Sequence, residues 1–437
     1  MRHHYFVLII LIATSSLFAQ ELRKLTLEDC IQIALENNTK IVSAHSNANM
    51  SQANLKASRG NFMPRIDAYS GWRKRSEEWN TIRFDQLVSS KESYHYQVEL
   101  SQPIFTGFGN YAALKMNQTE NEKSKNVLRW TKQTVILDVK FRFYNVLKQQ
   151  QLLKVAEDAV EISQGELNRI EEMERLGAAS RAEVYQQKVN LGQNKLALVN
   201  AKNNLSNALT ELNYTLGIDM TTEIALIPES EETLIESFDS TFEEVITEAL
   251  NNRLDYKIAN NELQYARSNV KYQKSGFYPT VSIFGSYNWW DVQFPQSKRE
   301  IDEFDSYSFG VNLNINLFNG FKTKANVQHA QAAVISAEAN LEQAKRQVVM
   351  DVKTTMLEID KAIENIELTK ENISLAEEDY KLASERFRIG AGTLLEQLTA
   401  QNTLTKAKID LIQAIYDYKY AMTALDLAIG RLDSQPY

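Results

Sequence analysis

The side chains that most often carry chemistry in proteins are scattered in this sequence of 437 residues. Beyond the first few residues the histidines are His45, His95 and His329, and none has a second histidine or a cysteine close by. A zinc site needs three or four such ligands at short spacings, so this pattern predicts no metal site. There is also no phosphate-binding glycine loop and no nucleophile turn of the G-x-S-x-G type. The sequence therefore supports neither an enzyme nor a bound cofactor.

The remaining charged and sulfur-bearing residues have ordinary structural explanations. Glu171, Glu172 and Glu174 form an acidic run that is most simply a solvated helix face. Cys30 is the only cysteine, which excludes an internal disulfide framework. The formal net charge is −8, and general nucleic-acid binders depend on a strong basic patch. We therefore expect no nucleic-acid partner.

The N-terminal segment has the pattern of a secretory signal peptide over residues 1–19. Arg2 is followed by an apolar run from Tyr5 to Ala13 and then by small residues. After this segment no apolar run approaches the roughly 20 residues that a membrane-spanning helix needs. A membrane segment in the mature chain would therefore have to consist of strands.

The chain contains one large unit twice, once in each half of the sequence. We expect a first repeat over residues 20–217, an acidic linker over 218–240, a second repeat over 241–430 and a short tail over 431–437. This period is too long for a solenoid, whose repeats run to roughly 20 to 50 residues. The matching segments are Leu25-Thr26-Leu27 with Ser240-Thr241-Phe242, Phe62-Met63-Pro64 with Phe277-Tyr278-Pro279, Pro103–Phe108 with Asn316–Phe321, and Arg175-Leu176-Gly177-Ala178 with Arg388-Ile389-Gly390-Ala391.

Each repeat contains a proline-free stretch long enough for an extended helix. No proline lies between Pro103 and Pro228, or between Pro295 and Pro436, and a proline costs a helix interior about 3 kcal/mol. Apolar residues recur in the second stretch with an average step of about 3.6 residues, the period of one helical face. At about 1.5 Å per residue, the segment from Phe321 to Phe387 predicts a rod of roughly 100 Å. Such a rod must pack on other helices as a coiled coil.

The remaining helices follow from the repeat. The first long rod is expected from Asn110 to Arg175, with a reversal at residues 176–180 and a return helix to Leu216. In the second half the return helix runs from Thr393 to Ile429. Each half also opens with one further helix, predicted over residues 27–59 and 242–274.

Between these helices the apolar period changes from 3.6 to 2. Four strands of about 10 to 13 residues are expected, near residues 66–72, 94–100, 281–289 and 307–317. The polar segments 73–91 and 291–303 are predicted to be the hairpin loops, and Tyr287, Trp289 and Trp290 a girdle at a membrane interface. Strands with one apolar and one polar face fit a barrel between lipid and water, but four strands are too few to close it. Subunits must therefore share one barrel.

In the order and spacing of these segments the chain resembles the outer membrane efflux protein (TolC-like) family. The resemblance extends from about Leu25 to Arg431. It implies long antiparallel coiled-coil helices that form a tunnel across the periplasm. It also implies a homotrimer with a twelve-stranded barrel in outer-membrane lipid. The expected partners are a periplasmic adaptor protein and an inner-membrane transporter.

The resemblance also assigns candidate site residues. The two glycine reversals match the periplasmic tip where adaptors engage, and the helices just after them match a pore constriction. At the second constriction Glu396 keeps a carboxylate and Thr399 does not, and their first-half equivalents are Glu183 and Gln186. The tip residues are Arg175, Leu176, Gly177, Ala178, Ser180, Arg388, Ile389, Gly390, Ala391 and Thr393.

The resemblance implies a passive exit channel for small molecules exported by an inner-membrane pump. Two alternatives remain open on the sequence. One is the exit duct of a one-step (type I) protein secretion system, which uses the same architecture with a different pump. The other is a soluble periplasmic coiled-coil scaffold, against which the alternating strands argue.

Overall fold

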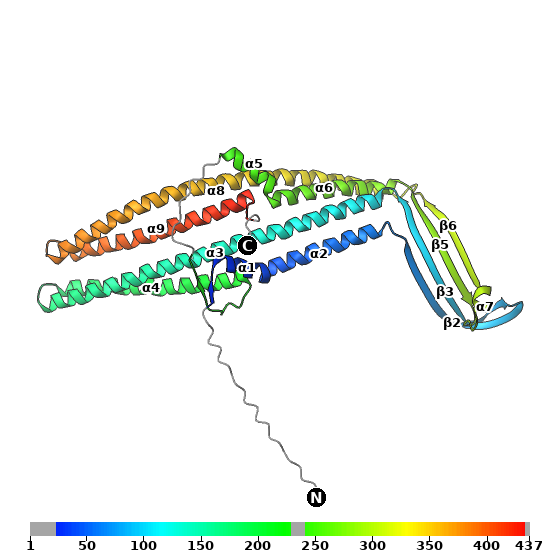
Figure 1. Ribbon diagram of the computed structural model, residues 1–437, viewed down its shortest axis with the longest axis horizontal. Coiled ribbons are helices and arrows are strands. Elements are labelled where there is room, and N and C mark those ends of the chain that lie inside the picture. Colours follow the sequence, from blue (N-terminus) through cyan, green and yellow to red (C-terminus); the bar gives the residue numbers. More distant parts are fainter. Residues whose placement is uncertain (1–22, 229–240, 433–437) are drawn as a thin grey trace, which may run out of the picture.

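The computed structural model describes residues 23–228 and 241–432, which form a long and narrow protomer (Figure 1). Its main helices are α3 (Gly109–Arg175), α4 (Arg181–Leu216), α8 (Lys322–Arg388) and α9 (Leu394–Ile429). A sheet continues from one end of this bundle, and two tight reversals close the other end. α3 and α8 have 67 residues each, so the predicted rods of roughly 100 Å are confirmed.

The opening helix of each half is broken in two, and the prediction of one unbroken helix is wrong. α1 (Leu27–Asn37) is followed by α2 (Thr39–Gly60), and α5 (Phe242–Asn252) is followed by α6 (Leu254–Lys274). The breaks occur at Asn38 and Arg253, which carry no proline or glycine signal. The Asn38 side chain caps α2 and donates to the carbonyl oxygen of Thr215 at 2.9 Å. Arg253 pairs with Asp351 of α8 at 2.7 Å.

The C-terminal ends of α4 and α9 abut these two breaks. Gly217 ends α4 with φ 72°, and Gly430 ends α9 with φ 81°. A Cβ on Gly217 would lie 2.7 Å from the carbonyl oxygen of Asn37, and one on Gly430 would lie 3.1 Å from the Cβ of Asn252. α2 therefore continues the line of α4, and α6 continues that of α9 (Figure 1).

Replacing Gly217 with alanine is expected to lower Tm more than replacing Gly177. Both glycines have positive φ, 72° and 79°, so both substitutions bear the backbone cost of about 1 kcal/mol. Only at Gly217 would the new methyl group also meet a backbone, whereas the space around Gly177 is open. The clash adds about 1 to 3 kcal/mol. Thermal unfolding followed by circular dichroism measures both variants, and equal losses would contradict close packing at the junction of α4 and α2.

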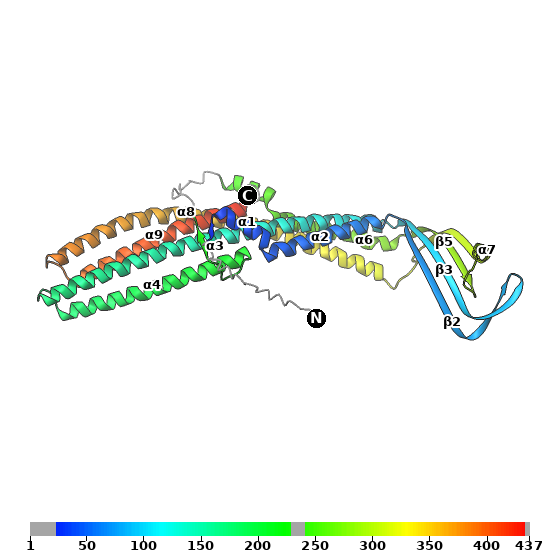
Figure 2. The same cartoon turned by 60° about the horizontal axis from the view of Figure 1, so that its bottom comes forward.

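The helices lie side by side in one layer. Near the reversals the order across the layer is α4, α3, α9, α8, and near the sheet it is α2, α3, α6, α8 (Figures 1 and 2). One apolar core joins α1 to α3 and α4 around Phe143 and Leu212. A second core joins α5 to α8 and α9 around Val352 and Leu425. Within the protomer α2 and α4 therefore form one edge of the layer, and α8 forms the other.

The sheet contains β2 (Arg65–Arg83), β3 (Gln86–Thr106), β5 (Thr280–Asp291) and β6 (Asp305–Asn314), antiparallel and in that order. The four predicted strands are confirmed, but the first hairpin is longer than expected. β2 has 19 residues and β3 has 21, so most of the predicted loop 73–91 is strand. Pairs such as Ile82 with Leu87 continue the ladder up to a turn at Phe84 and Asp85. Ile315 and Leu317 lie beyond the end of β6.

The outer ends of the two hairpins are bound together. The predicted loop 291–303 contains the short helix α7 (Lys298–Glu303). Arg83 at the end of β2 pairs with Asp291 at 2.9 Å and with Glu300 at 2.7 Å. Trp289 is 2% exposed, and its Nε1 donates to the carbonyl oxygen of Glu300 at 3.2 Å. The prediction that Trp289 belongs to a membrane girdle is therefore wrong, because this loop covers the indole.

The predicted linker begins with an element that the sequence did not reveal. β4 (Ile224–Leu226) pairs in parallel with β1 (Arg23–Leu25), so the start of the first repeat is tied to the linker that follows it. Residues 229–240 of the linker, the predicted signal peptide and most of the predicted tail lie outside the described residues. Among the helices that the structure does describe, none is both long and apolar enough to cross a membrane.

Candidate functional site

The reversal between α3 and α4 is built from two standard helix-end motifs. Gly177 has φ 79°, its N–H donates to Glu174, and the N–H of Ala178 donates to the carbonyl oxygen of Met173 at 2.7 Å. This is a Schellman ending, which commonly requires glycine. Ser180 then caps α4 in a capping box with Glu183. The predicted site residues in this loop thus turn the chain.

The second reversal repeats this construction. Gly390 has φ 75°, and the N–H of Ala391 donates to the carbonyl oxygen of Arg386 at 2.8 Å. Thr393 caps α9 in a capping box with Glu396. The equivalence of the two loops explains why the same residue types recur in the same order in both halves of the sequence.

Some tip residues have side chains without a role in the turn. Leu176 and Ile389 are each 69% exposed. Arg175 and Arg388 pair with Glu172 and Glu385 on their own helices. The hydrogen bond from Arg175 lowers the pKa of Glu172. The tip therefore presents two apolar side chains among paired charges.

The candidate constriction residues lie close behind the reversals. The carboxylate of Glu183 accepts the N–H of Ser180 at 2.6 Å, and that of Glu396 accepts the N–H of Thr393 at 3.4 Å. Glu396 also lies 3.9 Å from Arg386. Gln186 and Thr399 are exposed one turn further along, where the Thr399 hydroxyl donates to its own helix. Capping alone is thus a sufficient structural reason for both glutamates.

A cluster that the sequence analysis missed joins the two helical hairpins just above the tip. Arg169 of α3 donates to Glu166 at 2.6 Å and to Oε1 of Gln397 in α9 at 3.3 Å. Its guanidinium carbon also lies 5.2 Å from the ring centre of Phe387 in α8. Gln397 is 1% exposed. Apolar side chains of both hairpins, including Leu167 and Leu394, pack around this cluster.

Further from the tip than Arg169, the two helical hairpins are packed differently. Between α3 and α4, Ser163 is a buried hub that accepts hydrogen bonds from Gln187, Asn190 and Asn194. The equivalent position of the second repeat, in α8, is Ala376. It lines a cavity of about 380 Å³ between α8 and α9. The alanine has no side-chain group that could replace the hydrogen bonds of Ser163, so this part of the second hairpin lacks that hub.

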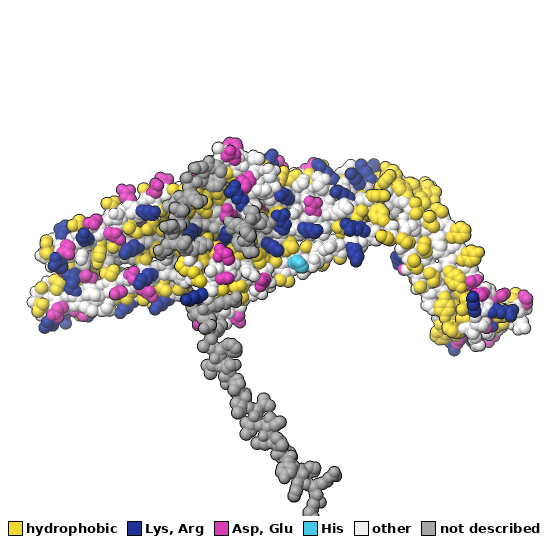
Figure 3. Space-filling view, viewed as in Figure 1, with side chains coloured by type: hydrophobic (Ala, Val, Ile, Leu, Met, Phe, Trp, Pro, Cys, Tyr) yellow, Lys and Arg dark blue, Asp and Glu magenta, His cyan; other side chains and the backbone are white. Residues whose placement is uncertain are grey.

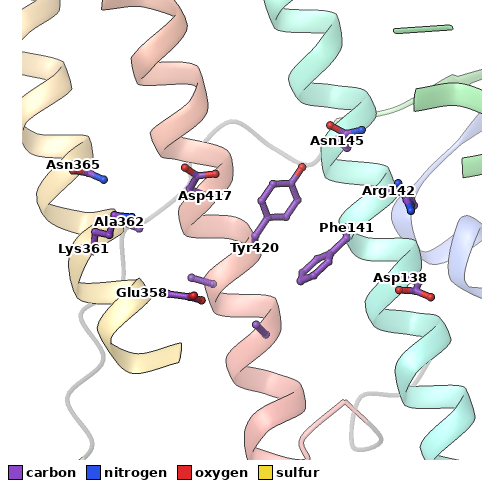
Figure 4. Close-up of a pocket in the computed structure, with 12 residues that line it drawn as sticks. Asp138, Phe141, Arg142, Asn145, Glu358, Lys361, Ala362, Asn365, Asp417 and Tyr420 are labelled. Atoms are coloured by element: carbon purple, nitrogen blue, oxygen red, sulfur yellow. The ribbon is translucent and has the colours of Figure 1, made fainter. Parts of the chain in front are cut away.

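A larger cavity of about 690 Å³ crosses α9 between α3 and α8 near the middle of the protomer (Figure 4). Its lining mixes carboxylates such as Asp417 with cations such as Arg142, and Phe141 meets Tyr420 edge to face at 5.2 Å. Burial raises the pKa of Tyr420 to about 12. In the parts of the chain that the structure describes, no three His, Cys, Asp or Glu side chains lie close enough to hold a metal ion.

The sequence matches the profile of the outer membrane efflux protein family over residues 30–218 and 245–431. The chain belongs to this family. Family members act as passive channels, and this chain is a protein of the outer membrane. The matched segments cover both repeats, including α3, α4, α8 and α9 with both reversals.

Curated relatives match over most of the chain. Outer membrane protein TolC of Vibrio cholerae is 22% identical over 403 residues, which cover 92% of this chain and 90% of that protein. The solvent efflux pump outer membrane protein SrpC of Pseudomonas putida is 23% identical over 332 residues, which cover 73% of this chain and 67% of SrpC.

Solved structures show the same fold. The Campylobacter jejuni CmeC outer membrane channel superimposes with a TM-score of 0.82 at 16% identity, covering 92% of this chain and 85% of CmeC. Outer membrane protein VceC of Vibrio cholerae gives a TM-score of 0.81 at 15% identity, covering 92% and 96% of the two chains. The match to the family profile confirms the prediction of this family from the reversals and strands.

Proposed function

We propose that this protein is the outer-membrane exit duct of a tripartite efflux system and works as a homotrimer. The observation that carries the proposal is that, among the described residues, both the sheet and the helical layer of the protomer have two edges without a neighbouring element. β2 and β6 are the unpaired edges of the sheet, and an open sheet edge is not tolerated in lipid. Four strands cannot close a barrel, whereas three copies supply twelve.

The helical layer has apolar stripes along the same two edges. On α8 the exposed Leu368, Leu375 and Leu382 recur every seven residues. On α4 the exposed Tyr185, Val189, Leu196 and Val199 face away from α3. Heptad spacing of this kind marks a coiled-coil seam. Two different edges that fit each other give a head-to-tail ring that closes by rotation.

The internal repeat supplies a template for this seam. Inside the chain α3 packs on α9, and shifting this contact by one repeat places α8 against α4 of the next subunit. Arg169 and Leu398 of the internal seam become Leu382 and Tyr185. The corner at which the sheet meets the helices can be treated in the same way, by shifting a contact by one repeat. A Cβ on Gly107 would lie 2.5 Å from the carbonyl oxygen of Ser275, whereas nothing lies within 4 Å of the equivalent Gly320.

A neighbouring subunit would fill the open space around Gly320. The equivalent of Ser275 is Gly60, which also has open space around it in the protomer. We assign the contact of Gly320 to Gly60 of the next subunit. Engineered cysteines test the helical seam: Tyr185→Cys combined with Leu382→Cys is expected to form covalent trimers under oxidation. If oxidation yields only monomers on a non-reducing denaturing gel, the assignment is contradicted. Each single cysteine variant is the control.

At the tip, we assign Leu176 and Ile389 to contact with a periplasmic adaptor that links the duct to an inner-membrane transporter. Their exposure supports this, because the other loop residues are occupied in the two turns. Opening of the tip then requires the α8–α9 hairpin to move away from α3. In this account adaptor binding shifts a population between closed and open packings. The Arg169 cluster holds the closed form.

Replacing Glu396 with glutamine tests its place in the constriction. Three glutamates near a threefold axis would attract cations, so we expect lower cation selectivity and weaker block by multivalent cations. Glutamine also serves in a capping box, so α9 should start normally. Thr393→Ala is the control, because it removes the cap, at about 1 kcal/mol, but keeps the carboxylate. Planar-bilayer recordings measure both variants, and unchanged selectivity in Glu396→Gln would remove this residue from the gate.

A further inference from the structure

The distribution of acidic residues along the chain is uneven. Acids outnumber bases, 56 to 48, in the whole sequence. Yet residues 41–64, 100–119, 263–279 and 306–337 contain no Asp or Glu. These four segments lie on both sides of the corner at which the sheet meets the helices (Figure 1). The segments around this corner therefore carry only positive formal charges.

Six cations of these segments form what we call the basic collar. They lie in the last two turns of α2, the last turn of α6 and the first turn of α8: Lys56, Arg59, Lys271, Lys274, Lys322 and Lys324. All six are exposed. None forms an ion pair with a carboxylate of the described residues, whereas Arg267, further from the sheet, pairs with Glu338 at 2.9 Å.

Helix electrostatics explain only part of this arrangement. Cations near the C-terminal ends of α2 and α6 favour the helix dipole, but the N-terminal turn of α8 favours anions instead. Lys322 and Lys324 both lie in that first turn of α8. An external negative charge would account for all six residues.

Exposed apolar side chains border the collar on the side of the sheet. The corner presents Met63, Phe108, Phe277, Tyr278, Phe318 and Phe321. Figure 3 shows dark blue side chains over α6 and α8 up to the bend, where the hydrophobic surface begins. An apolar and aromatic band next to a row of cations is the pattern of a membrane interface.

We infer that the basic collar binds anionic phospholipid headgroups in the periplasmic leaflet of the outer membrane. This inference rests on the proposed placement of the sheet in that membrane. The helices lead away from the corner into the periplasm, so the cations lie at the level of the headgroups of that leaflet. Lysine and arginine near an anionic lipid surface attract it over about a Debye length. The collar would fix the height of the duct in the membrane.

The test measures which lipids the protein retains. The full mature protein is reconstituted in mixed bilayers of dioleoylphosphatidylglycerol and dioleoylphosphatidylcholine, extracted in mild detergent, and analysed by native mass spectrometry. The test variant is Lys56→Gln, Lys274→Gln, Lys322→Gln and Lys324→Gln together. A matched control removes the same charge from exposed lysines elsewhere on the wall: Lys195→Gln, Lys202→Gln, Lys345→Gln and Lys370→Gln.

We expect the wild type and the matched control to retain phosphatidylglycerol preferentially. The collar variant should lose at least about tenfold of this preference, since each lysine near an anionic surface contributes roughly fivefold. Four lysine-to-arginine replacements at the same positions should keep it. Equal lipid preference in collar and control variants would overturn the inference, as would a collar variant that changes only the anion selectivity of the channel.

The same preparations separate this inference from the proposed function. A wild type that conducts ions in a planar bilayer but shows no lipid preference refutes the collar alone. A wild type that retains phosphatidylglycerol but forms no conducting trimer refutes the duct and leaves the collar standing.

Discussion

Replacing Arg169 with alanine is expected to open the periplasmic tip of the trimer. The substitution removes a charged hydrogen bond to the buried Gln397 and a cation–π contact with Phe387. Together these interactions contribute about 2 kcal/mol to the closed packing. The ratio of open to closed hairpins would therefore rise about 30-fold in each subunit. Planar-bilayer recordings should show a higher conductance, and cells should become more sensitive to large antibiotics.

A matched control separates this effect from the loss of a surface charge. Arg346→Ala removes an arginine from α8 whose ion pair, with Glu342, is exposed and lies within one helix. Such a pair contributes only about 0.3 to 0.5 kcal/mol, so this variant should conduct like the wild type. If Arg169→Ala also keeps the wild-type conductance while remaining a trimer, the cluster does not hold the tip closed.

Replacing Leu375 and Leu382 with aspartate is expected to prevent trimer formation. Both side chains are exposed in the protomer, at 63% and 62%, so the substitutions cost an isolated chain little. In the ring they would lie in each seam between α8 and α4 of the next subunit. Burial of each leucine contributes roughly 2 kcal/mol, and buried aspartates would add a desolvation cost. Native mass spectrometry should therefore detect monomers where the wild type gives trimers.

Leu395→Asp is the control for this second prediction. Leu395 is equally exposed, at 63%, but it lies on α9, which has a helix on both sides within the protomer. It therefore points to a face of the wall, and its replacement should leave the trimer intact. Trimers of normal stability in the Leu375→Asp, Leu382→Asp variant would show that the seam is elsewhere.

The long helices were predictable because their signals are local and repeated over many turns. The absence of proline, the 3.6-residue period and the glycine reversals all agree, and α3 and α8 begin and end within a residue or so of the predicted positions. The breaks at Asn38 and Arg253 were not predictable in this way. Both depend on partners distant in sequence, Thr215 and Asp351, which only the folded chain brings close.

For the strands too, the local pattern was predictable and the contacts between distant residues were not. Alternation identified all four, but the polar composition of residues 73–91 concealed the extension of the first hairpin. That extension is stabilised by Arg83, whose partners Asp291 and Glu300 belong to the other half of the sequence. Such contacts leave no periodic signal.

At the candidate site the sequence located the two reversals correctly but not the cluster that joins them. The spacing of serine or threonine to glutamate already indicates a capping box, and the structure shows this role for Glu183 and Glu396. A signal for the missed cluster was available. Gln397 is a polar residue among core positions of α9, and such a residue needs a partner when it is buried. That partner, Arg169, lies in the other repeat.

The measurement that tests the account most directly is crosslinking of the tagged mature protein in native membranes, followed by mass spectrometry of the co-purified chains. We expect recovery from the outer-membrane fraction together with an adaptor and a proton-driven inner-membrane pump. Recovery with an ATP-driven exporter would favour the protein-secretion duct instead. A protein found in the soluble fraction, with neither adaptor nor pump attached, would contradict the exit-duct function itself.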